Sequence, residues 1–395
     1  MWEKVKTALI VLLGLSALFL LSRTWVYDME RESAEEPAEW APARQDYGRA
    51  AVTPSRCAVT ADGVRKGAQY SSVVRGVYQS FRPFLAEHLS AASSPRRLAE
   101  SEWGALMARD GVYFEYTGSY PLSLLCAWLS VKEGPESGDV TALGLAFDRD
   151  QTDLYWRETD GSVWCAKAGP RNAEWPGLTE SLSACSFDPS GWLLTVEDDA
   201  AYPGVSLLPP PDIAEDLAAY TPFMEVLGMP PLSTGFYTAG GSRVYIDAEG
   251  NRSCEIASDG SVFYTGSVPT ASGNREPDAL SVLRAYDTVT ALAQTMGAAE
   301  FTLRGVERDG EKLTVTFMVT VGRIPLAVEP AVVVTENGRI ASLSLKLCSA
   351  AFVAESVKPL DPNHAALLTA KTERLGLCYR EVSDGSAAVA WAVIG

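Results

Sequence analysis

The sequence predicts an α+β protein with a single N-terminal transmembrane helix and tandem domains in which helices cover antiparallel sheets. Three observations predict this class: an apolar run near the N-terminus, stretches with apolar residues every three or four positions, and stretches in which they alternate. The chain has 395 residues, of which 47% are hydrophobic and 21% are charged. This composition is globular, and at roughly 150 residues per domain the length suggests two or three domains.

The composition restricts the function. There are 33 Lys and Arg against 50 Asp and Glu, and a net charge of −17 argues against nucleic acid as a partner. Two histidines are too few for a His-rich metal site, and the seven cysteines include no C-x-x-C pair. Buried free thiols are the favoured state of these cysteines, with a single bridge such as Cys165–Cys185 as the alternative.

The first element is an uncharged run over residues 8–21, which predicts a membrane anchor. Fourteen helical residues span only about 21 Å, but Trp2 to Trp25 rises about 35 Å, enough for a hydrocarbon core of about 30 Å. The residues assigned to the anchor are Leu9, Ile10, Val11, Leu12, Leu13, Gly14, Leu15, Ser16, Ala17, Leu18, Phe19, Leu20 and Leu21. The residues assigned to its interfaces are Trp2, Lys4, Lys6, Arg23 and Trp25, whose rings and long basic side chains suit the headgroup region.

The flanks of the run predict its orientation. No small-residue cleavage motif follows Leu21, which favours an uncleaved anchor over a secretory signal peptide. Basic residues precede the run and acidic residues follow it, so the N-terminus is expected in the cytoplasm and the bulk of the chain outside the cell membrane. Residues 1–27 are thus a cytoplasmic stub with a single-pass anchor, and the acidic residues 28–53 are an extended tether.

The first folded region is predicted over residues 54–206. Apolar residues from Tyr70 to His88 follow helical spacing, and Pro83 inside them predicts a kink or two abutting helices. His88, near the apolar side, is expected to be a packing residue. The further elements expected here are helices over 103–107 and 121–129 and strands over 112–116, 143–147, 154–156 and 163–165.

Three prolines at 209–211 predict a linker over residues 207–212, followed by a second region over 213–395. The second region uses similar strands near 244–246 and 254–256. The phrase Asp-Gly-Ser-Val at 160–163 recurs at 259–262, which indicates either a duplication or one hairpin sequence used twice.

The best-defined element is an amphipathic helix over residues 276–296. The strands expected after it lie at 300–307, 311–321, 331–336 and 340–347, with turns at Asp309-Gly310 and Asn337-Gly338. One helix covering one face of an antiparallel meander is a cystatin-like layer. Residues 361–394 start the unit again, with a helix over 363–374 and a hairpin after it.

No sequence motif carries chemistry. A P-loop, a G-x-S-x-G elbow, an S-x-x-K nucleophile, H-E-x-x-H and G-x-G-x-x-G are all absent from the sequence. We therefore predict no catalytic, cofactor-binding or metal-binding residues, no cofactor, and no enzymatic activity. Trp156 and Trp164 could line a glycan groove, but their alternating positions are more typical of a sheet core.

The N-terminus WEKVKTALIVLLGLSALFLLSRTWVYD resembles that of the YycH/YycI-type regulators, single-span extracytoplasmic proteins of low-GC Gram-positive bacteria. The likeness continues by pattern through ESEWGALMARDGVYFEY, the Pro-Leu-Ser-Leu helix at 121–124, the strands at 138–164 and the C-terminal helix and hairpin. It implies two partners: a sister anchored regulator, and the transmembrane helices of a WalK-type cell-wall two-component sensor kinase.

The predicted function is accordingly a membrane-anchored, non-enzymatic regulator that modulates the kinase through transmembrane and extracytoplasmic contacts. The alternative is an anchored module that binds envelope glycan or peptide through aromatic residues.

Overall fold

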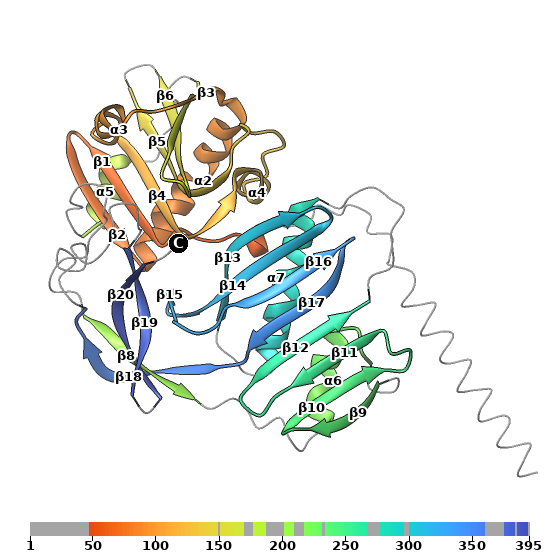
Figure 1. Ribbon diagram of the computed structural model, residues 1–395. Helices are drawn as coiled ribbons and strands as arrows, with labels where there is room; N and C mark the ends of the chain where they lie inside the picture. The colour runs from red at the N-terminus through yellow and green to blue at the C-terminus, as the bar shows by residue number, and fades with distance from the viewer. Residues whose placement is uncertain are drawn as a thin grey trace, which may run out of the picture. The chain divides into compact units, whose positions relative to one another are not determined.

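The computed structural model describes residues 47–148, 151–169, 177–186, 201–208, 217–230, 234–267, 277–295, 300–359, 375–383 and 385–393. All of them fall in the structural unit that begins at Tyr47. The described strands form antiparallel sheets of seven, nine and four strands, accompanied by a small number of helices (Figure 1). The α+β class with antiparallel sheets is therefore confirmed.

The first sheet has the order β2-β1-β4-β5-β6-β7-β3. Its strands are β1 (Arg56–Ala61), β2 (Val64–Gln69), β3 (Ser93–Arg97), β4 (Gly111–Pro121), β5 (Asp139–Phe147), β6 (Thr152–Glu158) and β7 (Val163–Lys167). The helices of this region are α2 (Ser72–Ala91), α3 (Glu100–Met107), α4 (Leu122–Trp128) and α5 (Leu178–Ala184). Helix α2 contacts β1, β2 and β6, so the predicted layer of helix on sheet is present here.

Helix α2 runs without interruption through Pro83, where two abutting helices were one expectation. Its buried face includes Phe81 and Leu85, both 0% exposed. Packing of this apolar stripe against the sheet stabilises the helix on both sides of the proline, because tertiary burial outweighs a local propensity. His88 is 1% exposed on the same face, which confirms the packing role.

Burial of His88 predicts a pH-dependent stability. Desolvation lowers the pKa of its imidazole below the ordinary 6.5. His88 of the unfolded chain therefore takes up a proton at a higher pH than His88 of the folded chain. The contribution of His88 to stability is complete above its pKa in the unfolded chain and is lost as the pH falls through its pKa in the folded chain. We expect the free energy of unfolding, measured in urea on the full-length chain, to fall less between about pH 7.5 and pH 5.5 in His88→Leu than in the parent chain. An identical loss in the two proteins would contradict this assignment.

The second sheet has the order β13-β14-β16-β17-β12-β11-β10-β9, with β15 paired to β14. Its strands are β9 (Thr234–Ala239), β10 (Ser242–Asp247), β11 (Arg252–Ile256), β12 (Ser261–Gly266), β13 (Glu300–Asp309), β14 (Lys312–Val321), β15 (Ile324–Pro325), β16 (Ala331–Glu336) and β17 (Arg339–Lys346). Helix α7 (Asp278–Thr295) contacts β13, β14 and β16, and α6 (Leu217–Val226) packs against α7. The predicted long helix and its meander are thus confirmed, and β9–β12 extend the same sheet.

The repeated Asp-Gly-Ser phrase makes the same turn in two different sheets. Ser162 N donates to Asp160 Oδ1 at 2.7 Å, and Ser261 N donates to Asp259 Oδ1 at 3.0 Å. The glycines between them have φ of +81° and +85°, a region that L side chains disfavour. The local chemistry of an Asx turn accounts for the repeated sequence.

The third sheet joins distant parts of the chain in the order β18-β8-β20-β19. Its strands are β8 (Tyr202–Leu208), β18 (Ser349–Val357), β19 (Leu375–Ser383) and β20 (Ser386–Val393). Leu207 and Leu208, predicted in the linker, are instead the last residues of β8, because β18 offers them backbone partners in Ala350 and Ser349. The C-terminal hairpin is present as β19 and β20, whereas the helix predicted over 363–374 and the prolines at 209–211 lie outside the described residues.

The predicted tether is wrong at its C-terminal end. Residues Tyr47–Ala50 form the 3₁₀ helix η1, which contacts α4 and α7. Ala50 and Val52 are 3% and 6% exposed, so they belong to the core. Burial of these small apolar side chains draws the segment onto the folded unit. Residues 28–46 lie outside the described residues, and the division into two domains stays a prediction.

All seven cysteines are free, and six of them are buried. The alternative Cys165–Cys185 bridge is wrong, because Cys185 instead hydrogen-bonds with Cys57 of β1, and this bond lowers the pKa of the Cys185 thiol. Trp156 is 1% exposed and donates to Ser137 Oγ at 2.6 Å, as expected of a sheet-core residue, while its cross-strand partner Trp164 is half-buried.

Candidate functional site: a two-arginine pocket

The site residues predicted from the sequence are the membrane anchor and its interface residues. They all lie at positions 2–25, outside the described residues, so their assignment stays a prediction. Among the helices that the structure does describe, none combines the length and the hydropathy needed to cross a bilayer.

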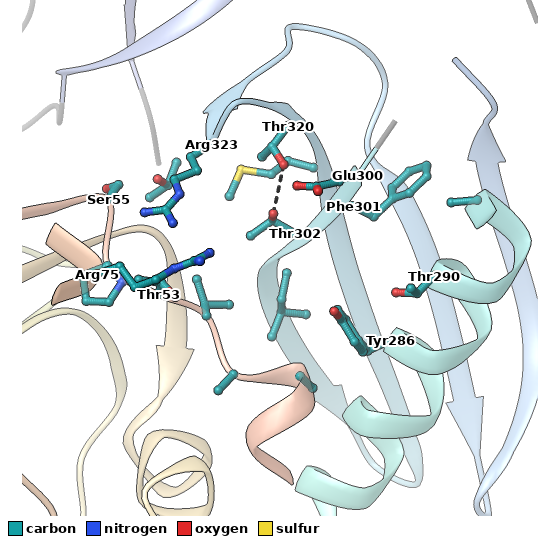
Figure 2. Close-up of a pocket in the computed structure, with 18 of the residues that line it drawn as sticks. Thr53, Ser55, Arg75, Tyr286, Thr290, Glu300, Phe301, Thr302, Thr320 and Arg323 are labelled. Carbon is teal, nitrogen blue, oxygen red and sulfur yellow. Dashed lines mark hydrogen bonds between the residues drawn. The ribbon is translucent and has the colours of Figure 1, made fainter. Parts of the chain in front are cut away.

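A pocket of about 410 Å³ is the strongest candidate site in the described chain. Its wall comes from the segment after η1, the start of α2, helix α7 and strands β13 and β14 (Figure 2). Within the same described ranges, no group of three or more His, Cys, Asp and Glu side chains lies close enough to hold a metal ion. The pocket therefore has to be understood from its arginines and hydroxyl groups.

Arg75 and Arg323 reach the pocket from opposite parts of the fold, and we call it the two-arginine pocket. Arg75 stands in the first turn of α2. Arg323 stands in the two-residue turn between Val321 of β14 and Ile324 of β15. Figure 2 shows both guanidinium groups pointing into the same space.

The turn that carries Arg323 has an unusual backbone. Gly322 and Arg323 have φ of +56° and +74°, as a type I′ hairpin turn requires. A non-glycine residue in this region costs about 1–2 kcal/mol. Arg323 Nη1 donates to Ser71 O at 2.8 Å, which fixes the guanidinium beside the start of α2.

The electrostatics of the pocket are set by the two like charges. Burial lowers the pKa of Arg323, the nearby charge of Arg75 lowers it further, and Glu300 of β13 opposes both effects. Glu300 nevertheless forms no ion pair with either arginine among the described residues. Opposite the arginines, Thr302 and Thr320 pair their hydroxyl groups at 3.1 Å. Such a set can bind an anion but offers no nucleophile activated by a neighbouring base.

The described residues have the architecture of a protein whose structure has been solved. The structure is similar to that of YycH from Bacillus subtilis, with a TM-score of 0.53, 11% sequence identity, and coverage of 89% of this chain and 95% of the YycH chain. The chain has the YycH fold. The resemblance to YycH/YycI-type proteins is thus confirmed at the level of the fold. At 11% identity, the similarity to YycH shows that the two proteins share an architecture and shows nothing about individual site residues.

Two further solved structures are too distant to support an inference. The Bacillus megaterium YpeB C-terminal domain has a TM-score of 0.29 and 11% identity, covering 45% of this chain and 85% of that domain. A putative thioesterase II from Thermobifida fusca has a TM-score of 0.14 and 12% identity, covering 68% of this chain and 100% of that one. No family model and no curated protein matches the sequence.

Sequence reasoning missed the two-arginine pocket. Arg75 and Arg323 are far apart in the chain, and neither belongs to a motif. The only local signal is Gly322-Arg323 between two strand-like stretches, and Arg is not a residue that favours such a turn.

Proposed function

We propose that this chain is a membrane-anchored, extracytoplasmic regulatory protein without enzymatic activity. In this proposal it modulates a cell-wall two-component sensor kinase through contacts in the membrane and outside it. The observation that carries the proposal is the YycH fold over 89% of the chain. A fold by itself does not imply a function, so a second observation is needed. The N-terminal sequence, with its apolar run over residues 8–21, supplies it.

The transmembrane part of the proposal depends on residues 8–21 crossing the bilayer as a helix. Gly14 with Ala17 or Ser16 would let another helix approach closely, as small residues do in membrane helix pairs. The proposal therefore places the kinase contact on this side of the anchor.

Exchange of the anchor tests the proposal in the native bacterium. Replacing residues 8–21 by an unrelated apolar segment of equal length is expected to abolish the effect of the chain on kinase output while the protein stays in the membrane. Gly14→Leu is expected to weaken that effect, because the added side chain separates the helices, and Leu12→Ile is the matched control. If the exchange of the anchor leaves kinase output unchanged, the proposed regulatory function is wrong.

An anchored envelope-binding module is the second candidate, and the two-arginine pocket favours it. The same exchange separates the two candidates. A binding module keeps its activity on any anchor that holds it outside the membrane, whereas a regulator that contacts kinase helices does not.

A further inference from the structure

The two guanidinium groups of the two-arginine pocket face each other without a carboxylate between them. Within the part of the chain that the structure describes, Arg75 makes no hydrogen bond or ion pair, and Arg323 makes only the bond to Ser71 O. An arginine has five N–H donors, so most of the donors of this pair are uncommitted. Holding two like charges together is unfavourable, and Glu300 offsets this only in part, because the pKa of Arg323 stays lowered. An anion placed between the two arginines would reverse the sign of their interaction.

We propose that the two-arginine pocket binds a small ligand through a single carboxylate, which Arg75 and Arg323 hold from two sides. Guanidinium groups donate to a carboxylate in a planar, forked geometry that an ammonium group cannot reproduce. The left-handed backbone at Arg323 fits this role, because strained backbone conformations are concentrated at ligand-binding sites, where they hold a side chain in position.

The start of α2 adds to the attraction for an anion. Tyr70 and Arg75, on either side of this helix start, both line the pocket. The N-cap residue Ser71 makes no side-chain capping bond, and the first turn contains no acidic residue. The first N–H groups of a 20-residue helix carry a partial positive charge, so they reinforce the two arginines.

Glu300 restricts the ligand to one negative charge. Figure 2 shows its carboxylate on the β13 side of the pocket, opposite the arginines. A second anionic group on the ligand would be repelled there, whereas an amine or hydroxyl group could donate to Glu300. The pocket thus fits a carboxylate with a hydrogen-bond donor a few bonds away, as in an amino acid or the end of a short peptide. A volume of about 410 Å³ accommodates either.

This inference goes beyond the proposed function and does not depend on it. Ligand binding is measured on the isolated chain, whereas regulation is measured as kinase output in cells, so either can fail alone.

Binding to the purified full-length chain in detergent, followed by saturation-transfer NMR and thermal shift, tests the proposal. The compounds are trialanine, trialanine C-terminal amide, free alanine and inorganic phosphate. We expect trialanine or alanine to bind and to raise the unfolding temperature in a concentration-dependent manner. Tighter binding of trialanine indicates a peptide end as the ligand, and tighter binding of alanine indicates a free amino acid.

The variants separate a binding role from a structural one. Arg75→Gln is expected to weaken binding at least about tenfold. Arg75→Lys keeps the charge but loses the forked guanidinium geometry, so it is expected to weaken binding by a smaller factor. Arg323→Asn should act like Arg75→Gln, since asparagine tolerates the left-handed backbone. Arg82→Gln on the same helix is the matched control, because Arg82 donates to Trp128 O and does not line the pocket.

Three results would overturn the proposal: binding of the amide equal to that of the acid, phosphate binding tighter than either carboxylate, or no binding of trialanine and alanine. Unchanged affinity in Arg75→Gln would overturn it as well. Arg75 is exposed, so its substitution is expected to leave the fold intact. Arg75→Gln therefore tests the binding role of the pocket even if Arg323→Asn does not fold.

Discussion

Glu115→Leu is expected to lower the free energy of unfolding by about 3–5 kcal/mol, because it leaves a charge buried without its partner. Arg56 of β1 and Glu115 of β4 lie directly opposite each other in the first sheet. Their side chains are 2% and 6% exposed, with Arg56 Nη1 at 3.5 Å from Glu115 Oε1. Burial acts to lower the pKa of Arg56, but Tyr70 and Glu115 outweigh it and raise that pKa, so the guanidinium stays charged.

Two further variants isolate the effect of charge burial at Glu115. The double variant Arg56→Met, Glu115→Leu is expected to recover much of the loss, because no unpaired charge then remains. Lys312→Gln breaks the exposed pair with Glu336, whose atoms lie 3.9 Å apart, and is expected to cost at most about 1 kcal/mol. Urea unfolding followed by circular dichroism measures all three. A loss in Glu115→Leu no larger than in Lys312→Gln would show that the buried pair does not matter.

Gly118→Ala is expected to destabilise the chain by about 3 kcal/mol through overpacking. A Cβ atom at Gly118 would overlap the carbonyl oxygen of Arg304 and lie 2.6 Å from Tyr120 Oη. This is where β4 of the first sheet meets β13 of the second, and Tyr120 Oη donates to Leu303 O at 2.6 Å in the same contact. The added methyl group must therefore push the two strands apart.

Gly305→Ala is the matched control for Gly118→Ala, since Gly305 lies on β13 within the same contact. A Cβ there would find Ser119 O at 3.7 Å, which is ordinary van der Waals contact. We expect thermal unfolding and limited proteolysis of Gly305→Ala to resemble those of the parent chain, and Gly118→Ala to unfold and be cleaved earlier. Equal behaviour of the two alanine variants would mean that the close approach of β4 and β13 is not a constraint.

Elements with strong local signals could be predicted from the sequence. Helix α7 has an uninterrupted apolar stripe, and the hairpins after it turn at Asp309-Gly310 and Asn337-Gly338. Gly310, Asn337 and Gly338 have the positive φ values that such turns favour. The mixed α+β class follows from these periodicities alone. The YycH-type resemblance also rested on pattern, and the fold retains that pattern at 11% identity.

Features that depend on distant pairing could not be predicted. Leu207 and Leu208 precede three prolines, a composition typical of a linker, but the partners that make them a strand lie in β18, more than a hundred residues later. The segment from Tyr47 to Val52 is too short to show a period, so its burial was missed. Arg75 and Arg323 meet only because α2 and the β14–β15 turn come together in the folded chain.

The position of β8 between β18 and β20 has a consequence for the order in which the protein matures. Both neighbours of β8 emerge from the ribosome well over a hundred residues after it, so each of its edges waits, unpaired, until the last part of the chain has been made. An exposed strand of this kind readily adds to another chain. A nascent protein halted before Leu375 would lack the strand pair that closes this sheet, and an edge of β8 would stay open to pairing with another chain.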